Sequence, residues 1–169
     1  MGVYSVSKLI GEARRLARDY RQATGKSLGG ISAEIAQYDA AEILGLEVVQ
    51  GQAGGYDAIG KGERKGKKIQ IKGRVVFDEK KSGQRVGQIK IDQEWDSVLL
   101  VLMDDQYESC EIYEAQRDDI LAELSNAKGG RRSRRGAISV AKFKNIGRLV
   151  WDRELGIVGD EIWDNIGGA

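Results

Sequence analysis

The sequence contains no histidine and a single cysteine, Cys110. Without histidine, the chain cannot form a zinc finger, a histidine-based metalloprotease site, a Ser-His-Asp triad or a phosphohistidine. One cysteine excludes an internal disulfide and fits a reducing compartment, so we expect a cytoplasmic protein. Any metal ion would have to be held by oxygen ligands, which favours Mg²⁺ or Mn²⁺ over zinc.

Long apolar runs are also missing. No stretch is long enough to span a bilayer, and the N-terminus lacks the basic region and apolar block of a signal peptide. We therefore expect neither a membrane partner nor a targeting segment. Charged residues make up 31% of the chain and apolar residues 41%, which is typical of a folded domain. A length of 169 residues suits one domain, and we find no internal repeat.

The net charge of +1 hides a strong segregation of charge along the chain. Residues 61–74 and 128–148 are basic, and residues 92–123 are acidic with Arg117 as the only base. Two basic blocks in a nearly neutral chain predict a local surface that binds a polyanion.

Apolar spacing predicts an alternation of helices and strands. An N-terminal helix over 5–23 has Ser5 and Gly25 at its ends, and its four arginines read as a solvated basic face or as phosphate contacts. A second helix is capped by Ser32 and stopped by Gly45. The domain core is expected over about 28–125, followed by a basic loop over 128–136 and a C-terminal helix over 139–155 capped by Ser139. The expected strands are 46–50, 56–59, 68–77, 86–91, 96–103 (covered on both faces) and 110–113 (at an edge), with a helix over 116–124.

The most informative residues are Asp57, Gln70 and Lys72. The segment Lys68-Ile69-Gln70-Ile71-Lys72 alternates, so the two isoleucines point to one face of a strand and the amide and ammonium groups to the other. A hairpin over 60–67 would bring Asp57 opposite them. A carboxylate, an amide oxygen and a lysine on one sheet edge suit metal-assisted phosphodiester hydrolysis.

This pattern, a helix with Glu34, a strand, an Asp strand and a Gln-x-Lys strand, resembles the PD-(D/E)XK nuclease superfamily. More narrowly, it is similar to the branch with Gln in place of the usual acid, which includes Mrr-type restriction endonucleases. The resemblance covers roughly residues 30–103. It implies an α/β, restriction endonuclease-like fold, with a central mixed β-sheet flanked by helices. It also implies a metal-dependent DNA endonuclease of a restriction, repair or phage-defence type.

The resemblance assigns a role to each matching residue. Asp57 would bind Mg²⁺ or Mn²⁺ directly, with the Gln70 side-chain oxygen and the Ile71 carbonyl as further ligands. Lys72 would orient or deprotonate the attacking water, or stabilise developing negative charge. Glu34 would hold water on the metal or a second metal. From its position alone, Glu34 is equally well read as a partner of the helix dipole.

The glutamine leaves alternatives open. Replacing an acid removes one negative charge, so Mg²⁺ should bind more weakly and Glu34 should matter more. A second interpretation is therefore a catalytically inactive nucleic-acid-binding protein on a nuclease fold. A third is a structural or subunit protein whose polar strand is an ordinary sheet edge.

Two segments are candidates for contact with nucleic acid, with double-stranded DNA as the expected partner. One is the Gln-x-Lys strand with the basic hairpin before it. The alternative interpretation of this hairpin is an ordinary solvated turn. The other is the glycine-flanked arginine loop, whose binding should weaken with salt. Analogy with the superfamily adds a homodimer, because duplex cleavage needs two sites. The candidate contact residues are Lys61, Arg64, Lys65, Lys67 and Arg74, and Arg131, Arg132, Arg134 and Arg135.

Overall fold

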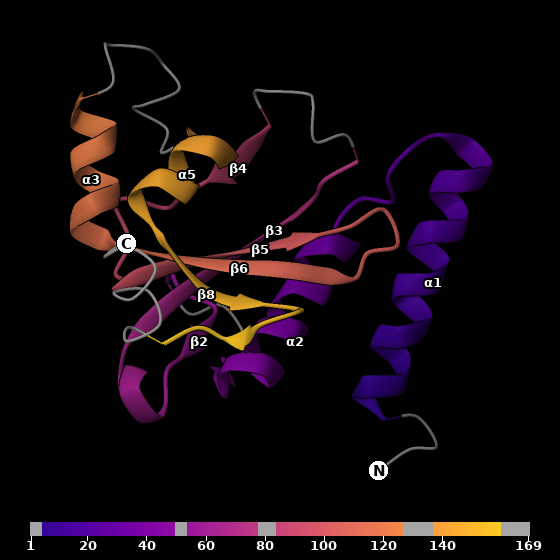
Figure 1. Cartoon of the computed structure of the whole chain (residues 1–169), viewed down its shortest axis with the longest axis horizontal. Helices are drawn as coiled ribbons and strands as arrows, with labels where there is room; N and C mark the ends of the chain where they lie inside the picture. Colours follow the sequence, from indigo (N-terminus) through magenta and orange to yellow (C-terminus); the bar gives the residue numbers. More distant parts are fainter. Residues whose placement is uncertain (1–4, 50–53, 78–83, 127–136, 160–169) are drawn as a thin grey trace.

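The computed structural model describes residues 5–49, 54–77, 84–126 and 137–159 (Figure 1). Within these ranges the chain is an α/β domain built on a mixed sheet, in the order β1-β2-β3-β5-β6-β8-β9. β3 and β5 pair in parallel, and the other neighbours in the sheet are antiparallel. The strands are β1 (Glu47–Val48), β2 (Ala58–Ile59), β3 (Lys68–Val75), β4 (Arg85–Gln88), β5 (Ser97–Met103), β6 (Ser109–Gln116), β7 (Ala137–Ser139), β8 (Arg148–Asp152) and β9 (Gly156–Ile157).

Helices cover both faces of this sheet (Figure 1). α2 (Ile31–Leu44) packs on one face, with α1 (Val6–Thr24) outside it. The other face carries α3 (Arg117–Asn126), α5 (Val140–Ile146) and the two-stranded ribbon of β4 and β7. Each face therefore has its own apolar core, and β5 contributes to both because all of its residues are buried. This confirms the expectation that the apolar run over 96–103 is covered on both sides.

The close packing of α2 on β3 depends on Gly73. A Cβ atom at this position would lie 2.6 Å from the Ala36 Cβ and 2.9 Å from the Ser32 carbonyl oxygen. Both distances are too short for any real side chain, so only glycine lets the helix approach this near. α2 thus packs closely on β3, on the face opposite to the one that carries Gln70 and Lys72.

Most of the predicted helix ends are confirmed. The Ser5 side chain accepts a hydrogen bond from the Lys8 N–H, and Ser139 does the same for Lys142. Gly25 and Gly45 end their helices in the left-handed conformation. The prediction that Ser32 caps α2 is wrong: the helix begins at Ile31, with Gly30 as a cap that has no side-chain hydrogen bond.

Three predictions about the second half of the chain are wrong. The C-terminal helix over 139–155 ends at Ile146, and β8 follows after Gly147. Because β8 pairs with β6, the strand expected as an edge over 110–113 lies inside the sheet. The core also extends beyond residue 125, since Ile138, Phe143 and Val150 are buried. The run Leu149-Val150-Trp151 is β-prone, and the open edge of β6 gives it hydrogen-bond partners that a helix would forgo.

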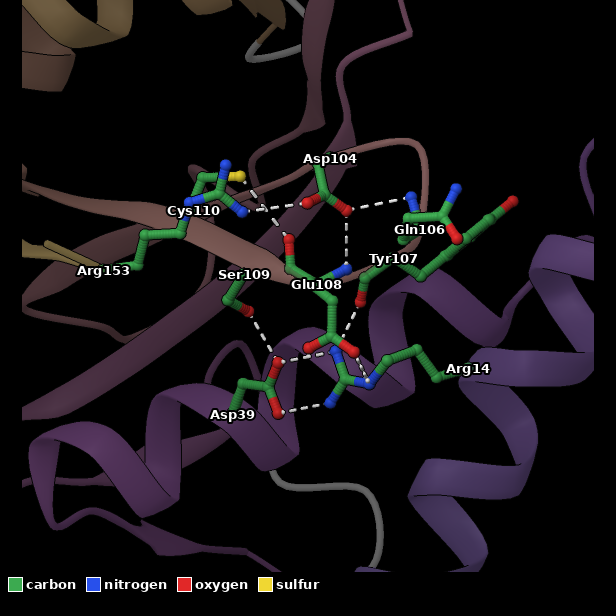
Figure 2. A network of polar contacts seen from close by, with 9 residues as sticks. All are labelled: Arg14, Asp39, Asp104, Gln106, Tyr107, Glu108, Ser109, Cys110 and Arg153. Atoms are coloured by element: carbon green, nitrogen blue, oxygen red, sulfur yellow. Dashed lines mark hydrogen bonds and ion pairs between the residues drawn. The ribbon is translucent and has the colours of Figure 1, made fainter.

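A polar network fixes α1 to the rest of the domain (Figure 2). Arg14 makes a two-pronged ion pair with Asp39 of α2, at 3.0 and 3.2 Å, and also donates to the Tyr107 carbonyl. Ser109 Oγ donates to the same Asp39 carboxylate at 2.6 Å. The two interpretations of the α1 arginines, a solvated basic face or phosphate contacts, are therefore both wrong for Arg14, whose guanidinium is held inside the domain. In the part of the chain that the structure describes, no helix is long and apolar enough to cross a membrane.

Candidate active site

Asp57 lies directly before β2, on the face of the sheet that also carries Gln70 and Lys72. The register pairs Ala58 with Ile69, so residue 57 continues the pairing opposite Gln70. The Asp57 N–H donates to the Ile69 carbonyl at 2.8 Å, and the Asp57 Oδ2 accepts from the Ile71 N–H at 2.8 Å. The paired residues of β2 do not reach Ile71. The Asp57 carboxylate therefore accepts the hydrogen bond from the Ile71 N–H that a longer β2 strand would otherwise accept. This confirms the predicted alternation and the predicted hairpin.

Gln70 is the most unusual residue of this group, because it is polar yet only 2% exposed. Its Oε1 lies 3.5 Å from the Lys90 N–H, which is a long hydrogen bond. Its Nε2 has no hydrogen-bond partner. A buried amide without partners lowers stability by about 1–3 kcal/mol, so such groups are uncommon in folded proteins and frequently serve function.

Three cationic residues, Lys72, Lys90 and Arg74, lie in the region of Asp57 and Gln70. Lys72 is partly buried on the face of Gln70, as its register partner Leu100 requires. Burial lowers the pKa of the Lys72 ammonium; the nearby Asp57 carboxylate opposes this, and the charges of Lys90 and Arg74 add to it. Positive charge thus outweighs negative charge here, which suits an anionic group such as a phosphate.

Arg74 is held in place by backbone groups. Its guanidinium donates to the Arg85 carbonyl at 2.6 Å and to the Gly73 carbonyl at 2.7 Å. Burial lowers its pKa. Arg74 therefore ties β3 to β4, in addition to contributing positive charge beside Lys72.

Lys90 is a site residue that the sequence did not reveal. It belongs to the segment between β4 and β5, which the alternation over 86–91 had assigned to a strand. The Trp95 indole N–H donates to the Lys90 carbonyl at 2.7 Å, and Arg117 donates to the Ile91, Gln93 and Trp95 carbonyls at 3.0–3.1 Å. Arg117 also stacks on the Trp95 ring, with 4.5 Å between the guanidinium carbon and the ring centroid. The segment over 89–95 is therefore pinned above Gln70.

The turn before Asp57 closes against the same segment. Gly55 has a φ of +92°, and a Cβ atom there would lie 2.2 Å from the Gln93 Cβ. Only glycine can combine this conformation with this close approach. The glycines at 54 and 55 thus let the chain enter β2 directly beneath the segment that carries Lys90.

Glu34 is not joined to the other predicted residues. It lies exposed in the first turn of α2, the helix that packs on the opposite face of β3. Among the described residues, no hydrogen bond or ion pair connects it to Asp57, Gln70 or Lys72. The structure thus brings together three of the four predicted catalytic residues.

The basic hairpin divides into two kinds of residue. Arg64 folds inward: its guanidinium pairs with the buried Glu114 of β6 at 3.1 Å, and Ser97 also donates to that carboxylate at 2.9 Å. Lys61 and Lys65 are exposed, and Lys67 reaches Gln116 at 3.5 Å. Lys65 and Lys67 line an open pocket whose other lining residues include two acids as well as a base: Asp96, Gln116, Arg117 and Asp118. The predicted contacts Arg131, Arg132, Arg134 and Arg135 lie outside the described residues.

The donor groups at this site are oxygens, as Mg²⁺ and Mn²⁺ prefer. Asp57, the Gln70 side-chain oxygen and the Ile71 carbonyl fit such an ion by chemistry and by strand position. Across the described ranges, however, no group of three or more His, Cys, Asp or Glu side chains could hold a metal. A cation here would therefore depend on one carboxylate and on neutral oxygens, which predicts weak binding.

Comparison with known proteins adds no assignment to this site. No family model matches the chain, and no curated protein matches it.

Proposed function

We propose that the chain is a metal-dependent DNA endonuclease that hydrolyses phosphodiester bonds, on a restriction endonuclease-like fold. The observation that carries the proposal is the placement of Asp57, directly before β2, on the face of the sheet that carries Gln70 and Lys72 of β3; the Asp57 carboxylate accepts a hydrogen bond from the Ile71 N–H at 2.8 Å. The mixed sheet flanked by helices supports the fold assignment at the level of class.

The resemblance to the nuclease superfamily assigns each of these groups a role in the proposed reaction. Asp57, Gln70 and the Ile71 carbonyl would hold a divalent cation, which would supply positive charge at the scissile phosphate when bound. Lys72 would orient the attacking water. Burial lowers the pKa of the Lys72 ammonium, so this group gives up a proton more readily than an exposed lysine does.

Lys90 and Arg74 complete the electrostatics of the site. Both lie close enough to Lys72 to affect its pKa, and neither has been given a catalytic role by the sequence pattern. We assign them to the phosphate, whose negative charge their cations would balance. The exposed Lys61 and Lys65 of the hairpin would extend this contact along the backbone of the nucleic acid.

A second candidate function is nucleic-acid binding without cleavage. The observation that favours it is the excess of positive charge: Lys90 and Arg74, as well as one carboxylate, Asp57, lie close enough to the Lys72 ammonium to act on it. Such a site would bind a phosphate without needing a metal ion. The two functions differ in one property, because only the first requires Mg²⁺ or Mn²⁺.

The test is cleavage of plasmid and single-stranded DNA with Mg²⁺ or Mn²⁺, with the wild type compared to Asp57→Asn and Lys72→Met. Asn at 57 keeps an acceptor for the Ile71 N–H but removes the charge. A matched control is Asp105→Asn, at an exposed position in the turn after β5. We expect metal-dependent cutting by the wild type and the control, and a loss of at least about 100-fold in both site variants.

Two other results would change the conclusion. Cutting that survives both site substitutions would place the activity elsewhere or in a contaminant. Clean wild-type protein that binds DNA with steep salt dependence but never cuts would establish the second candidate.

A further inference from the structure

The outer side of α1 carries an apolar stripe that the domain leaves uncovered. Val6, Leu9, Leu16 and Tyr20 are between 37% and 62% exposed, although they form the apolar stripe of an amphipathic helix. The helix contacts the domain instead through a different face, about 100° around the helix axis from the stripe. This face carries Ile10, Arg14, Ala17 and Arg21. Figure 1 shows α1 at the outer edge of the molecule, beside α2.

The spacing of the stripe is that of a helix-pairing seam. Positions 6, 9, 13, 16 and 20 alternate steps of three and four residues, which is the spacing of the a and d positions of a coiled coil. Ala13 occupies the centre and is small enough to let a second helix approach. A helix of 19 residues is about 28 Å long, so five such positions span most of it.

The charges beside the stripe identify the partner. Glu12 and Asp19 border it, and Lys8 and Arg15 lie next to them on the same side. Consider a second copy of α1 that packs antiparallel to the first about a two-fold axis, in the register that places residue 12 of one helix opposite residue 15 of the other. Glu12 then faces Arg15 of the second copy, and Asp19 faces Lys8, so every one of these acids meets a base.

The same register also interleaves the apolar side chains. Leu9 falls between Leu16 and Tyr20 of the second copy, and Leu16 falls between Leu9 and Ala13. Within the described ranges, neither Glu12 nor Arg15 has an ion-pair partner in its own chain. The helix as a whole carries five bases and two acids, so an anionic membrane is the competing occupant, and the test below separates it from a second copy.

We infer that the chain forms a homodimer through antiparallel pairing of α1 with α1. The pairing leaves the face of Asp57, Gln70 and Lys72 open, because α1 and α2 lie on the other side of the sheet. The inference does not depend on the proposed nuclease activity, so either can fail without the other.

The test is the molar mass in solution, measured by sedimentation velocity over a range of concentrations. We expect a wild-type dimer, and a monomer for Leu16→Glu. Leu16 is 57% exposed, so the variant should keep the wild-type circular dichroism and melting temperature when compared as monomers. Glu12→Arg should raise the dimer dissociation constant about tenfold, because two symmetric attractive pairs become repulsive. The double variant Glu12→Arg with Arg15→Glu should restore it.

Several results would overturn the inference. A wild type that stays monomeric at high micromolar concentration would do so, as would a dimer unaffected by Leu16→Glu. A failure of the double variant to recover would reject the antiparallel register. Binding of the monomer to anionic vesicles through α1 would assign the stripe to a membrane instead.

Discussion

The Oδ2 of Asp57 accepts a hydrogen bond from the Ile71 N–H at 2.8 Å. This bond holds the carboxylate beside the strand residue that separates Gln70 from Lys72, so one interaction sets the spacing of all three side chains. It also satisfies a backbone donor of β3 that β2, which pairs only through Ala58 and Ile59, does not reach. The site is therefore part of the sheet and does not rest on a loose loop.

Replacing Gln70 should separate stability from function. Gln70 is buried with an unpaired Nε2, and its oxygen makes only a hydrogen bond of 3.5 Å. We expect Gln70→Leu to raise the free energy of unfolding by about 1 kcal/mol, since an apolar group removes the unpaired amide. The same change should abolish cleavage.

Urea denaturation and the plasmid assay measure the two effects of this substitution. Gln88→Leu is a matched control, because Gln88 is exposed and should give no stabilisation. A loss of 2 kcal/mol or more for Gln70→Leu, on the scale of an ordinary core defect, would mean that the amide is well satisfied in solution.

Alanine substitutions at two glycines should have opposite signs. Gly73→Ala places a Cβ atom 2.6 Å from the Ala36 Cβ, so α2 must shift and stability should fall by about 1–3 kcal/mol. Gly11→Ala in α1 meets no described atom within 4 Å and should gain about 0.5–1 kcal/mol from helix propensity. Thermal melts of both variants compare them directly. If Gly73→Ala changed stability no more than Gly11→Ala does, α2 would not lie as close to β3 as the distance of 2.6 Å implies.

The sequence was sufficient for the arrangement of Asp57, Gln70 and Lys72, because strand alternation and a hairpin are local properties. It was not sufficient for Lys90, whose position depends on Arg117 binding carbonyls more than 20 residues away in sequence. No periodicity records such a contact.

Predictions from local sequence patterns were also wrong where the same pattern fits both a helix and a strand. Ser139 and the apolar residues after it fit a long helix, yet the chain turns at Gly147 to pair with β6. Likewise, a helical wheel places Arg14 on the polar side of α1, and only the tertiary structure shows Asp39 opposite it. Both partners, the edge of β6 that pairs with β8 and the Asp39 carboxylate that pairs with Arg14, come from distant parts of the chain.

The ion pair of Arg14 and Asp39 should contribute measurably to stability. Their side chains are 14% and 10% exposed, so removing one partner leaves the other largely buried without its counter-charge. We expect Arg14→Met to lower the free energy of unfolding by about 3 kcal/mol. A double-mutant cycle with Asp39→Asn should give a coupling of more than about 1 kcal/mol. Arg18→Met, which breaks the exposed pair with Asp19, should stay within about 0.5 kcal/mol. Equal losses at both arginines would contradict the docking of α1.

Asp104 should make stability depend on pH in the acid range. Partial burial acts to raise its pKa, but the Glu108 and Gln106 N–H groups and Arg153 outweigh this and lower the pKa (Figure 2). The folded state then binds fewer protons than the unfolded state, so this stabilisation is present above the unfolded pKa of about 3.9 and is lost as pH falls through the lower folded value. Asp104→Asn should therefore cost about 1–2 kcal/mol at neutral pH and progressively less in acid. Urea titrations between neutral and acid pH measure the difference, with Asp105→Asn, at an exposed position of the same turn, as the control. A difference that stays constant with pH would mean that the Asp104 carboxylate has the same pKa in the folded and unfolded chains, and that Arg153 does not hold it.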